Sequence, residues 1–277
     1  MRIGLFIATV STLLAAGVAV GQESGLRRLL SGADSRGWEA VGRLEFDRRA
    51  FCTGAMVAPD LVLTAAHCLF ERASGTRFAP EEIVFRAGWR NRRATAVARV
   101  VQVVVHPEFV PGQGGEVSRV GVDLALLRLQ SPVRKTSIRP FATAPRPARG
   151  DEVAVVSYAR ERADSPSLQE SCRVLARRSG VLVMDCAVDF GASGAPVFVR
   201  DETGGARIVS VISARARSGA REVALGAILD RPLEVLMTLL ANTEPAPPEP
   251  GDAVRVFTLG GGSEPPDAPP GARFLRP

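Results

Sequence analysis

From residue 38 onward, short apolar runs alternate with polar turns that contain glycine or proline. The runs in the first half of this region are residues 51–57, 61–63, 83–85, 97–105 and 124–129. Those in the second half are residues 153–158, 181–184, 196–199, 208–212 and 223–229. Runs this short and this rich in β-branched residues predict strands. No strand alternates with a long helical pattern, so the chain is predicted to be all-β, as a sandwich or barrel.

One helix is predicted near the end of this region. Asp230 is a suitable N-cap, and Pro232 falls in the first turn. Leucine and methionine then recur at helical spacing, at Leu233, Leu236, Met237 and Leu240. This pattern predicts a helix over about 230–241, packed against the core.

The two ends of the chain differ from the strand-rich region. An apolar stretch follows Arg2 and ends in small residues at 19 and 21, which predicts a cleaved signal peptide over 1–21. No other stretch is long and apolar enough to span a bilayer. Residues 22–36 are polar and basic and are predicted to be a mobile leader, or propeptide. Residues 243–277 hold nine of the 20 prolines and are predicted to be a disordered tail.

Charge and cysteine content narrow the function classes. The net charge is +6, but Lys135 is the only lysine and the arginines are scattered, so nucleic-acid binding is not expected. In an exported chain, four cysteines predict disulfides, and the count allows three pairings. With two histidines and no C-x-x-C spacing, a structural zinc site is not predicted.

Three polar residues lie where nucleophilic catalysis would need them. His67 follows an apolar run, and Asp123 opens the strongly apolar stretch 123–129. A carboxylate at such a place requires a partner, and an imidazole N–H is a suitable one. Ser193 lies in the small-residue turn 191–196 (GASGAP), where a serine hydroxyl and backbone N–H groups can converge.

These segments resemble the chymotrypsin/trypsin family of serine proteases. The matching segments, in order, are residues 52–54 with 63–68, 105–109, 123–129 and 191–196. The resemblance covers about residues 38–240, and its motifs point to the bacterial branch that includes the glutamyl endopeptidases. It implies two packed antiparallel β-barrels and a C-terminal helix. The protease domain would span 37–242, with the first barrel over about 37–135 and the second over about 148–230.

The resemblance also implies a role for each residue. Ser193 would be the nucleophile, His67 the general base and then acid, and Asp123 the group that orients His67. The N–H groups of Gly191 and Ser193 would form the oxyanion hole. His106 would not be catalytic. The family's disulfide beside the histidine corresponds to Cys52–Cys68. This match favours pairing between cysteines that are neighbours in sequence, so it also implies Cys172–Cys186.

Two positions depart from the digestive members of the family. Ala192 replaces the aspartate that pairs with a newly cleaved N-terminus, and no suitable aliphatic start lies near Arg36. We therefore expect no activation of that kind. Ala187 falls at the floor of the specificity pocket, which does not support cleavage after Arg or Lys. Ser213, Ala214 and Arg215 are expected to form the wall along the substrate backbone, with Arg215 either favouring an acidic side chain or facing solvent.

The sequence thus predicts a monomeric serine endopeptidase that acts on polypeptides without a cofactor. It is expected to be exported to the periplasm or secreted, with no membrane span after signal removal. The alternative is a weakly active or inactive binding protein of the cell envelope with the same fold. A protease-chaperone is disfavoured because the chain ends in the predicted tail after the second barrel. An α/β-hydrolase esterase is disfavoured by the order His, Asp, Ser.

Overall fold

A computed structural model describes residues 25–47, 50–112 and 117–243 of the chain. The predicted signal peptide and the predicted tail beyond Thr243 lie outside these residues. Two sheets, three 3-10 turns and two α-helices make up the described part.

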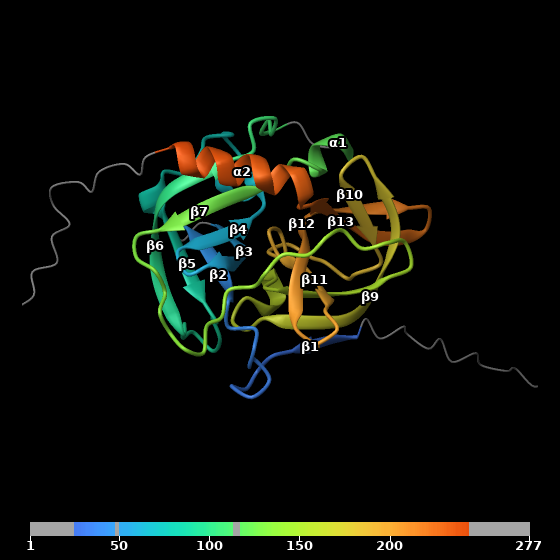
Figure 1. Ribbon diagram of the computed structural model, residues 1–277, viewed down its shortest axis with the longest axis horizontal. Coiled ribbons are helices and arrows are strands. Elements are labelled where there is room, and N and C mark those ends of the chain that lie inside the picture. Colours follow the sequence, from blue (N-terminus) through green and yellow to red (C-terminus); the bar gives the residue numbers. More distant parts are fainter. Residues whose placement is uncertain (1–24, 48–49, 113–116, 244–277) are drawn as a thin grey trace, which may run out of the picture. The chain divides into compact units, whose positions relative to one another are not determined.

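The first sheet closes into a six-stranded antiparallel barrel (Figure 1). Its strands are β2 (Val41–Phe46), β3 (Ala50–Ala58), β4 (Leu61–Thr64), β5 (Ile83–Ala87), β6 (Ala96–Val105) and β7 (Ala125–Leu129). The order is β2-β3-β4-β7-β6-β5, and pairing of β2 with β5 completes the ring. Alternate residues of β5 are buried, as expected of a strand with one face toward a core.

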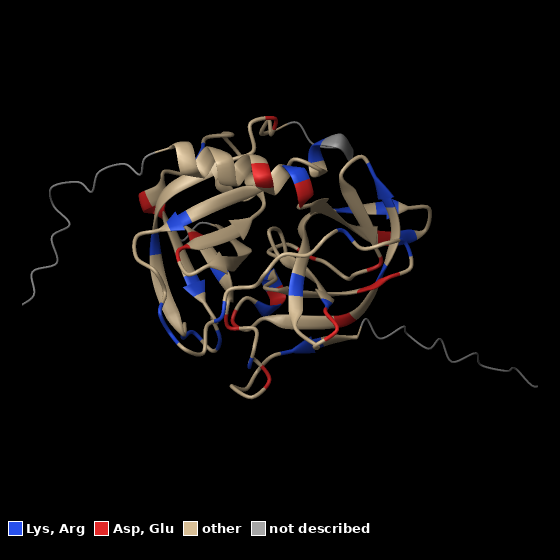
Figure 2. Cartoon of the chain, in the orientation of Figure 1, with Lys and Arg blue, Asp and Glu red and all other residues tan. Residues whose placement is uncertain are grey.

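The second sheet also closes. It contains β8 (Glu152–Ser157), β9 (Ser167–Arg178), β10 (Val181–Met184), β11 (Pro196–Arg200), β12 (Ala206–Ser218) and β13 (Arg221–Ile228). The order is β9-β10-β13-β12-β11-β8, and β8 pairs with β9 to close the barrel. The prediction of two antiparallel barrels is therefore confirmed. Basic and acidic residues are spread over strands and loops of both barrels (Figure 2).

The segment before the first barrel differs from the predicted mobile leader. Residues Leu26–Arg28 form β1, which pairs antiparallel with β9. Leu29 is fully buried, and its N–H donates to Pro166 O at 2.9 Å. The prediction of mobility is wrong for this stretch, because a three-residue strand is too short to produce a recognisable alternating pattern.

The C-terminal helix α2 (Asp230–Asn242) lies beside β6 and β7 of the first barrel (Figure 1). Leu236 and Leu240 are its buried residues, as its spacing predicted. Asp230 is the first helical residue and does not act as a side-chain cap; its charge instead complements the positive end of the helix dipole. None of the described helices is long and apolar enough to cross a membrane.

Aromatic packing and backbone hydrogen bonds join the two barrels. The ring of Phe198 on β11 lies 5.1 Å from Trp38 and 4.7 Å from Phe141, both in edge-on arrangements. Thr53 N, on β3, donates to Ser193 O at 2.9 Å. The loop before β11 is thus bonded directly to a strand of the other barrel, and the predicted catalytic residues lie at this junction.

Candidate active site

Strand pairing brings His67 and Asp123 together. β4 ends at Thr64 and β7 begins at Ala125, and these two residues are paired in the antiparallel register. His67 follows β4 in the 3-10 turn η1 (Ala66–Leu69), and Asp123 precedes β7. Because antiparallel neighbours place one strand's end beside the other's start, residues 56 positions apart in sequence lie side by side.

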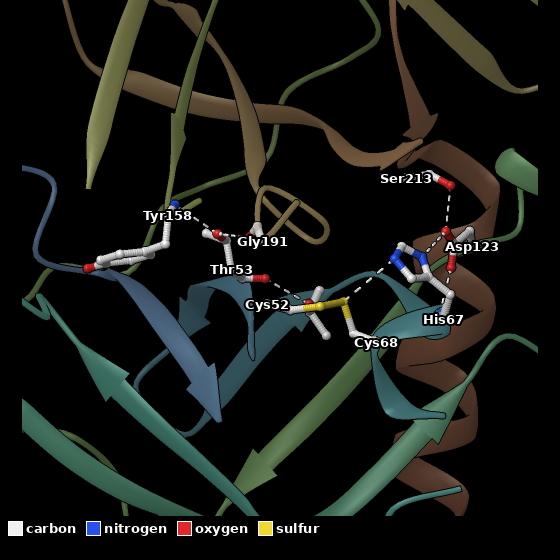
Figure 3. Close-up of a disulfide and its surroundings, with 9 residues drawn as sticks. Cys52, Thr53, His67, Cys68, Asp123, Tyr158, Gly191 and Ser213 are labelled. Carbon is white, nitrogen blue, oxygen red and sulfur yellow. Dashed lines mark hydrogen bonds and ion pairs between the residues drawn. A yellow bond between two sulfur atoms is a disulfide. The ribbon is translucent and has the colours of Figure 1, made fainter. Parts of the chain in front are cut away.

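Asp123 is buried and receives three hydrogen bonds. Its Oδ2 lies 2.6 Å from His67 Nδ1 and accepts the Ser213 hydroxyl at 2.5 Å, while Oδ1 accepts the His67 backbone N–H at 2.8 Å (Figure 3). These bonds replace the water that a buried carboxylate loses. A carboxylate only accepts, so Nδ1 carries a hydrogen and the neutral ring keeps its lone pair on Nε2.

Ser193 lies in a turn that is tightly held from both barrels. Its carbonyl accepts from Thr53 N, and the next residue, Gly194, donates its N–H to Ile212 O at 2.8 Å. Gly194 has a φ of +78°, and a Cβ there would lie 2.1 Å from Thr64 Oγ1. Only glycine fits this position, since both the backbone conformation and the space exclude a side chain.

His67 and Ser193 border the same two cavities, of about 450 and 330 Å³. Among the described residues, Ser193 Oγ has no hydrogen-bond partner. His67 Nε2 lies 3.9 Å from Cys68 Sγ (Figure 3). Bonds between a nucleophile and its base are often long without substrate and shorten in the reacting complex. The two side chains therefore border the same two cavities, together called the cleft below, but no hydrogen bond joins His67 to Ser193.

Two backbone donors beside Ser193 are also unused. Within the described part of the chain, neither the Gly191 N–H nor the Ser193 N–H donates to an acceptor. Both residues border the larger cavity. Unpaired N–H groups next to a hydroxyl can stabilise an oxyanion that forms there.

The two cavities have different walls. Five phenylalanines and the Cys52–Cys68 disulfide border the larger one, where the rings are Phe46, Phe51, Phe70, Phe78 and Phe190. The smaller one is bordered by Ser213, Ala214 and Arg215 of β12, as expected of a substrate wall. Ala187 is exposed and is not among its bordering residues, and its N–H donates to Gln169 Oε1 at 2.8 Å.

Three arginines surround Phe190, directly before Gly191. The guanidinium carbons of Arg160, Arg72 and Arg215 lie 5.2, 5.4 and 5.9 Å from the ring centroid. These distances fit cation–π contacts, and the ring is half exposed. Sequence reasoning identified only Arg215, because nothing in the sequence links the other two arginines to residue 190.

The structure contains both locally paired disulfides, Cys52–Cys68 and Cys172–Cys186. Cys52, His67 and Cys68 come close enough together to suggest a metal site. The two sulfurs are bonded to each other, however, and a disulfide sulfur is not the thiolate that a metal needs.

The second histidine lies apart from the cleft. His106 is buried, and its Nδ1 accepts the Glu108 N–H at 3.3 Å. Burial lowers the pKa of His106, while the Glu108 carboxylate opposes that shift. His106 borders neither of the two cavities that contain Ser193, so it has no access to the predicted nucleophile.

Two closed six-stranded barrels with a helix after the second define a chymotrypsin-like fold. Residues 52–206 match the family model of the trypsin-like peptidase domain, which is more than half of the chain. The chain therefore belongs to the trypsin-like peptidase family.

Curated relatives match over shorter regions. A modular serine protease of Drosophila melanogaster is 36% identical over 102 residues, which are 35% of this chain and 16% of that protein. A trypsin of Saccharopolyspora erythraea is 32% identical over 92 residues, 33% of this chain and 36% of the relative. A trypsin of Phaedon cochleariae is 27% identical over 157 residues, 55% of this chain and 56% of the relative. The matches span at most about half of these relatives' lengths.

Among solved structures, a Glu endopeptidase in complex with MPD superposes with a TM-score of 0.64. The match covers 79% of this chain and 97% of the other, at 16% identity. At this level of identity, the likeness shows the fold.

Proposed function

We propose that the protein is an exported serine endopeptidase in which Ser193, His67 and Asp123 act as the catalytic triad. The observation that supports this most strongly is the orientation of His67. Asp123 holds its Nδ1–H, so the Nε2 lone pair is left for the cleft that His67 shares with Ser193. A base with a fixed tautomer, a hydroxyl and two free N–H donors are what acyl transfer requires.

In the proposed reaction, Ser193 Oγ attacks the carbonyl carbon of the scissile bond while His67 Nε2 takes its proton. The carbonyl oxygen becomes an oxyanion that accepts from the N–H groups of Gly191 and Ser193. The C–N bond then breaks as Nε2 returns the proton to the leaving amine, which leaves an acyl-enzyme. Water, deprotonated by His67, releases the acid and restores Ser193. Asp123 stays ionised and stabilises the imidazolium.

The charges beside Ser193 suggest a substrate class. Arg72, Arg160 and Arg215 border the two cavities, where the acidic residues are Glu71 and Asp189. Arg215 also pairs with Glu222 at 3.9 Å, so the positive charge beside Ser193 comes mainly from Arg72 and Arg160. This charge favours peptides with an acidic side chain close to the scissile bond. The name of the structural relative, a Glu endopeptidase, agrees with this preference.

Peptides that differ only in Glu or Gln near the cleaved bond test this preference. The Glu peptide is expected to be cleaved faster, and its advantage should decline as the salt concentration rises. Equal rates would contradict the preference.

Export is supported by two features. Both disulfides form readily only in an oxidising compartment. Residues 1–21 carry the pattern of a signal peptide. Periplasmic and secreted locations are both compatible with these features. The alternative, an inactive binding protein, is less favoured because such a protein has no need to keep the His67–Asp123 pair beside Ser193.

Cleavage of a peptide library by the purified chain from Gln22 onward, read by mass spectrometry, tests the proposal. The matched control is Ser193→Ala, which removes one oxygen from a half-buried side chain. Specific cleavage by the native chain that is lost in the variant is expected. No cleavage by folded native protein, or equal cleavage by the variant, would contradict the proposed function.

A further inference from the structure

The residue directly before Ser193 is Ala192, which is fully buried. Its methyl side chain has no charge with which to anchor the turn 190–194 that carries both proposed oxyanion donors. This turn, here called the oxyanion loop, contains Gly191 at a φ of +100°. Glycine has many accessible conformations, so contacts from outside the loop must select this one.

The first such contact fixes the peptide unit between Phe190 and Gly191. Arg160 N donates to Phe190 O at 2.7 Å. In a trans peptide, the C=O and the N–H point in opposite directions, and the described residues contain no cis peptide. With Phe190 O directed at Arg160, the Gly191 N–H points the other way and stays free for an oxyanion.

The second contact fixes the following peptide unit through one buried hydroxyl. Thr53 Oγ1 donates to Gly191 O at 2.9 Å and accepts from Tyr158 N at 3.0 Å (Figure 3). Because the Tyr158 N–H can only donate, the hydroxyl hydrogen must point to Gly191. Thr53 also donates its own N–H to Ser193 O, so it binds the oxyanion loop at two places.

The segment 158–160, which contains Tyr158 and Arg160, is itself anchored by hydrogen bonds. Tyr158 is fully buried, and its hydroxyl donates to Trp89 O at 2.8 Å. Burial raises the pKa of Tyr158 far above its ordinary value, so the hydroxyl remains a donor. Trp89 in turn donates from Nε1 to Ala163 O at 3.0 Å. The oxyanion loop therefore rests on a hydrogen-bonded chain that runs through both barrels.

We infer that Thr53, together with Tyr158 and the Arg160 backbone, holds the oxyanion loop in its competent form without a newly cleaved N-terminus. Thr53 is a positioning residue: it touches no reacting atom, and it acts through Gly191 and Ser193. The inference rests on the proposed function and adds how its oxyanion hole is kept formed. It also accounts for a buried alanine at position 192, since the loop has other anchors.

The test compares Thr53→Val with Thr53→Ser. Valine keeps the shape of threonine but cannot bridge Tyr158 N and Gly191 O, whereas serine keeps the hydroxyl. Small displacements at a reacting centre lower the rate strongly, so we expect kcat to fall roughly tenfold or more in Thr53→Val with little change in KM. Thr53→Ser should stay within about twofold of native kcat.

A second readout separates positioning from general destabilisation. A peptide boronate occupies the oxyanion hole when it bonds to Ser193, whereas the amine-side product peptide, which lacks the carbonyl of the cleaved bond, does not. Thr53→Val should weaken boronate binding by about the same factor as kcat/KM and leave product binding unchanged. If Thr53→Val does not fold, Tyr158→Phe removes only the anchoring hydroxyl and should lower kcat with KM unchanged. Native kcat in whichever of the two variants folds would overturn the inference.

Whether activity requires proteolytic cleavage near the N-terminus is an independent test of the inference. The uncleaved chain from Gln22, with its N-terminus confirmed by mass, should already cleave peptides. Activity that appears only after a cut within residues 25–40 would overturn the inference and leave the proposed protease function intact. Absence of all activity in the native chain would instead contradict the proposed function.

Discussion

Asp123 binds His67 through both of its carboxylate oxygens. Oδ2 lies 2.6 Å from the ring Nδ1, and Oδ1 accepts the backbone N–H of the same residue at 2.8 Å. The carboxylate therefore fixes the main chain and the ring of His67 together. This double contact sets both the place and the tautomer of the proposed base.

Asp123→Asn should lower kcat about 10⁴-fold, the loss typical of this change in a Ser-His-Asp triad, with the fold retained. An amide cannot accept at both positions, so the ring would take the tautomer with its hydrogen on Nε2. The matched control is Ser213→Ala, which removes one of the three donors to Asp123 and leaves the tautomer unchanged. Steady-state kinetics should show a far smaller loss for this control. Equal losses would show that tautomer control is not the role of Asp123.

Two glycines allow the packing around the nucleophile to be measured. Gly194 and Gly204 have φ values of +78° and +80°, so alanine is strained similarly at both. A Cβ at Gly194 would lie 2.2 Å from Thr53 O, whereas at Gly204 it would meet nothing within 4 Å. Gly204→Ala should cost about 1–2 kcal/mol in free energy of unfolding, and Gly194→Ala more than about 3 kcal/mol.

Denaturant unfolding of both glycine variants gives this comparison. If Gly194→Ala lowers the free energy of unfolding no more than Gly204→Ala does, the turn can move away from Thr53, contrary to the close packing described above.

Burial of His106 predicts a pH dependence of stability. The folded-state pKa of His106 lies below its ordinary value of 6.5, so below about that pH the unfolded chain binds the additional proton. Stability should therefore fall as the pH is lowered through this range, and protonation would also break the bond from Glu108 N to Nδ1. Thermal unfolding from pH 7 to pH 5 should show a smaller decrease in Tm for His106→Gln than for the native chain. An identical decrease would contradict a role for His106.

The two disulfides should have similar effects on stability and different effects on activity. They close loops of similar length, with sequence separations of 16 and 14 residues, so replacing either pair by alanine should cost about 3 kcal/mol. Cys68 directly follows His67 in the same 3-10 turn, whereas Cys172 and Cys186 do not border the cavities that contain Ser193. At a temperature where both variants are folded, kcat should fall mainly in the Cys52→Ala, Cys68→Ala variant. Equal kcat values would contradict this difference.

Much of the fold was predictable because it depends on local patterns. Short apolar runs between turn residues identify strands such as β5, and helical spacing identifies the buried face of α2. The short motifs around His67, Asp123 and Ser193 indicated the candidate site, because each such motif is local in sequence. Strand β1 has no comparable pattern in its three residues, so its pairing with the second sheet was not predicted.

The contacts that Thr53 and Ser213 make with distant segments were not predictable from the sequence. Thr53 Oγ1 reaches Gly191, 138 residues away, and Tyr158, 105 residues away. Ser213 is predicted as part of the substrate wall, and the structure adds a bond from its hydroxyl to Asp123, 90 residues away. Such bonds depend on how the two barrels meet, and a threonine or serine in a strand gives no indication of its partner.

The most direct test of the central claim is labelling of the purified, uncleaved chain with a fluorophosphonate, followed by peptide mapping. This reagent bonds to a serine oxygen that is activated by a base and faces a formed oxyanion hole. The account predicts stoichiometric labelling at Ser193, lost in Ser193→Ala and strongly slowed in Asp123→Asn. No labelling of well-folded native protein would contradict the claim that Ser193, His67 and the oxyanion loop form a competent active site.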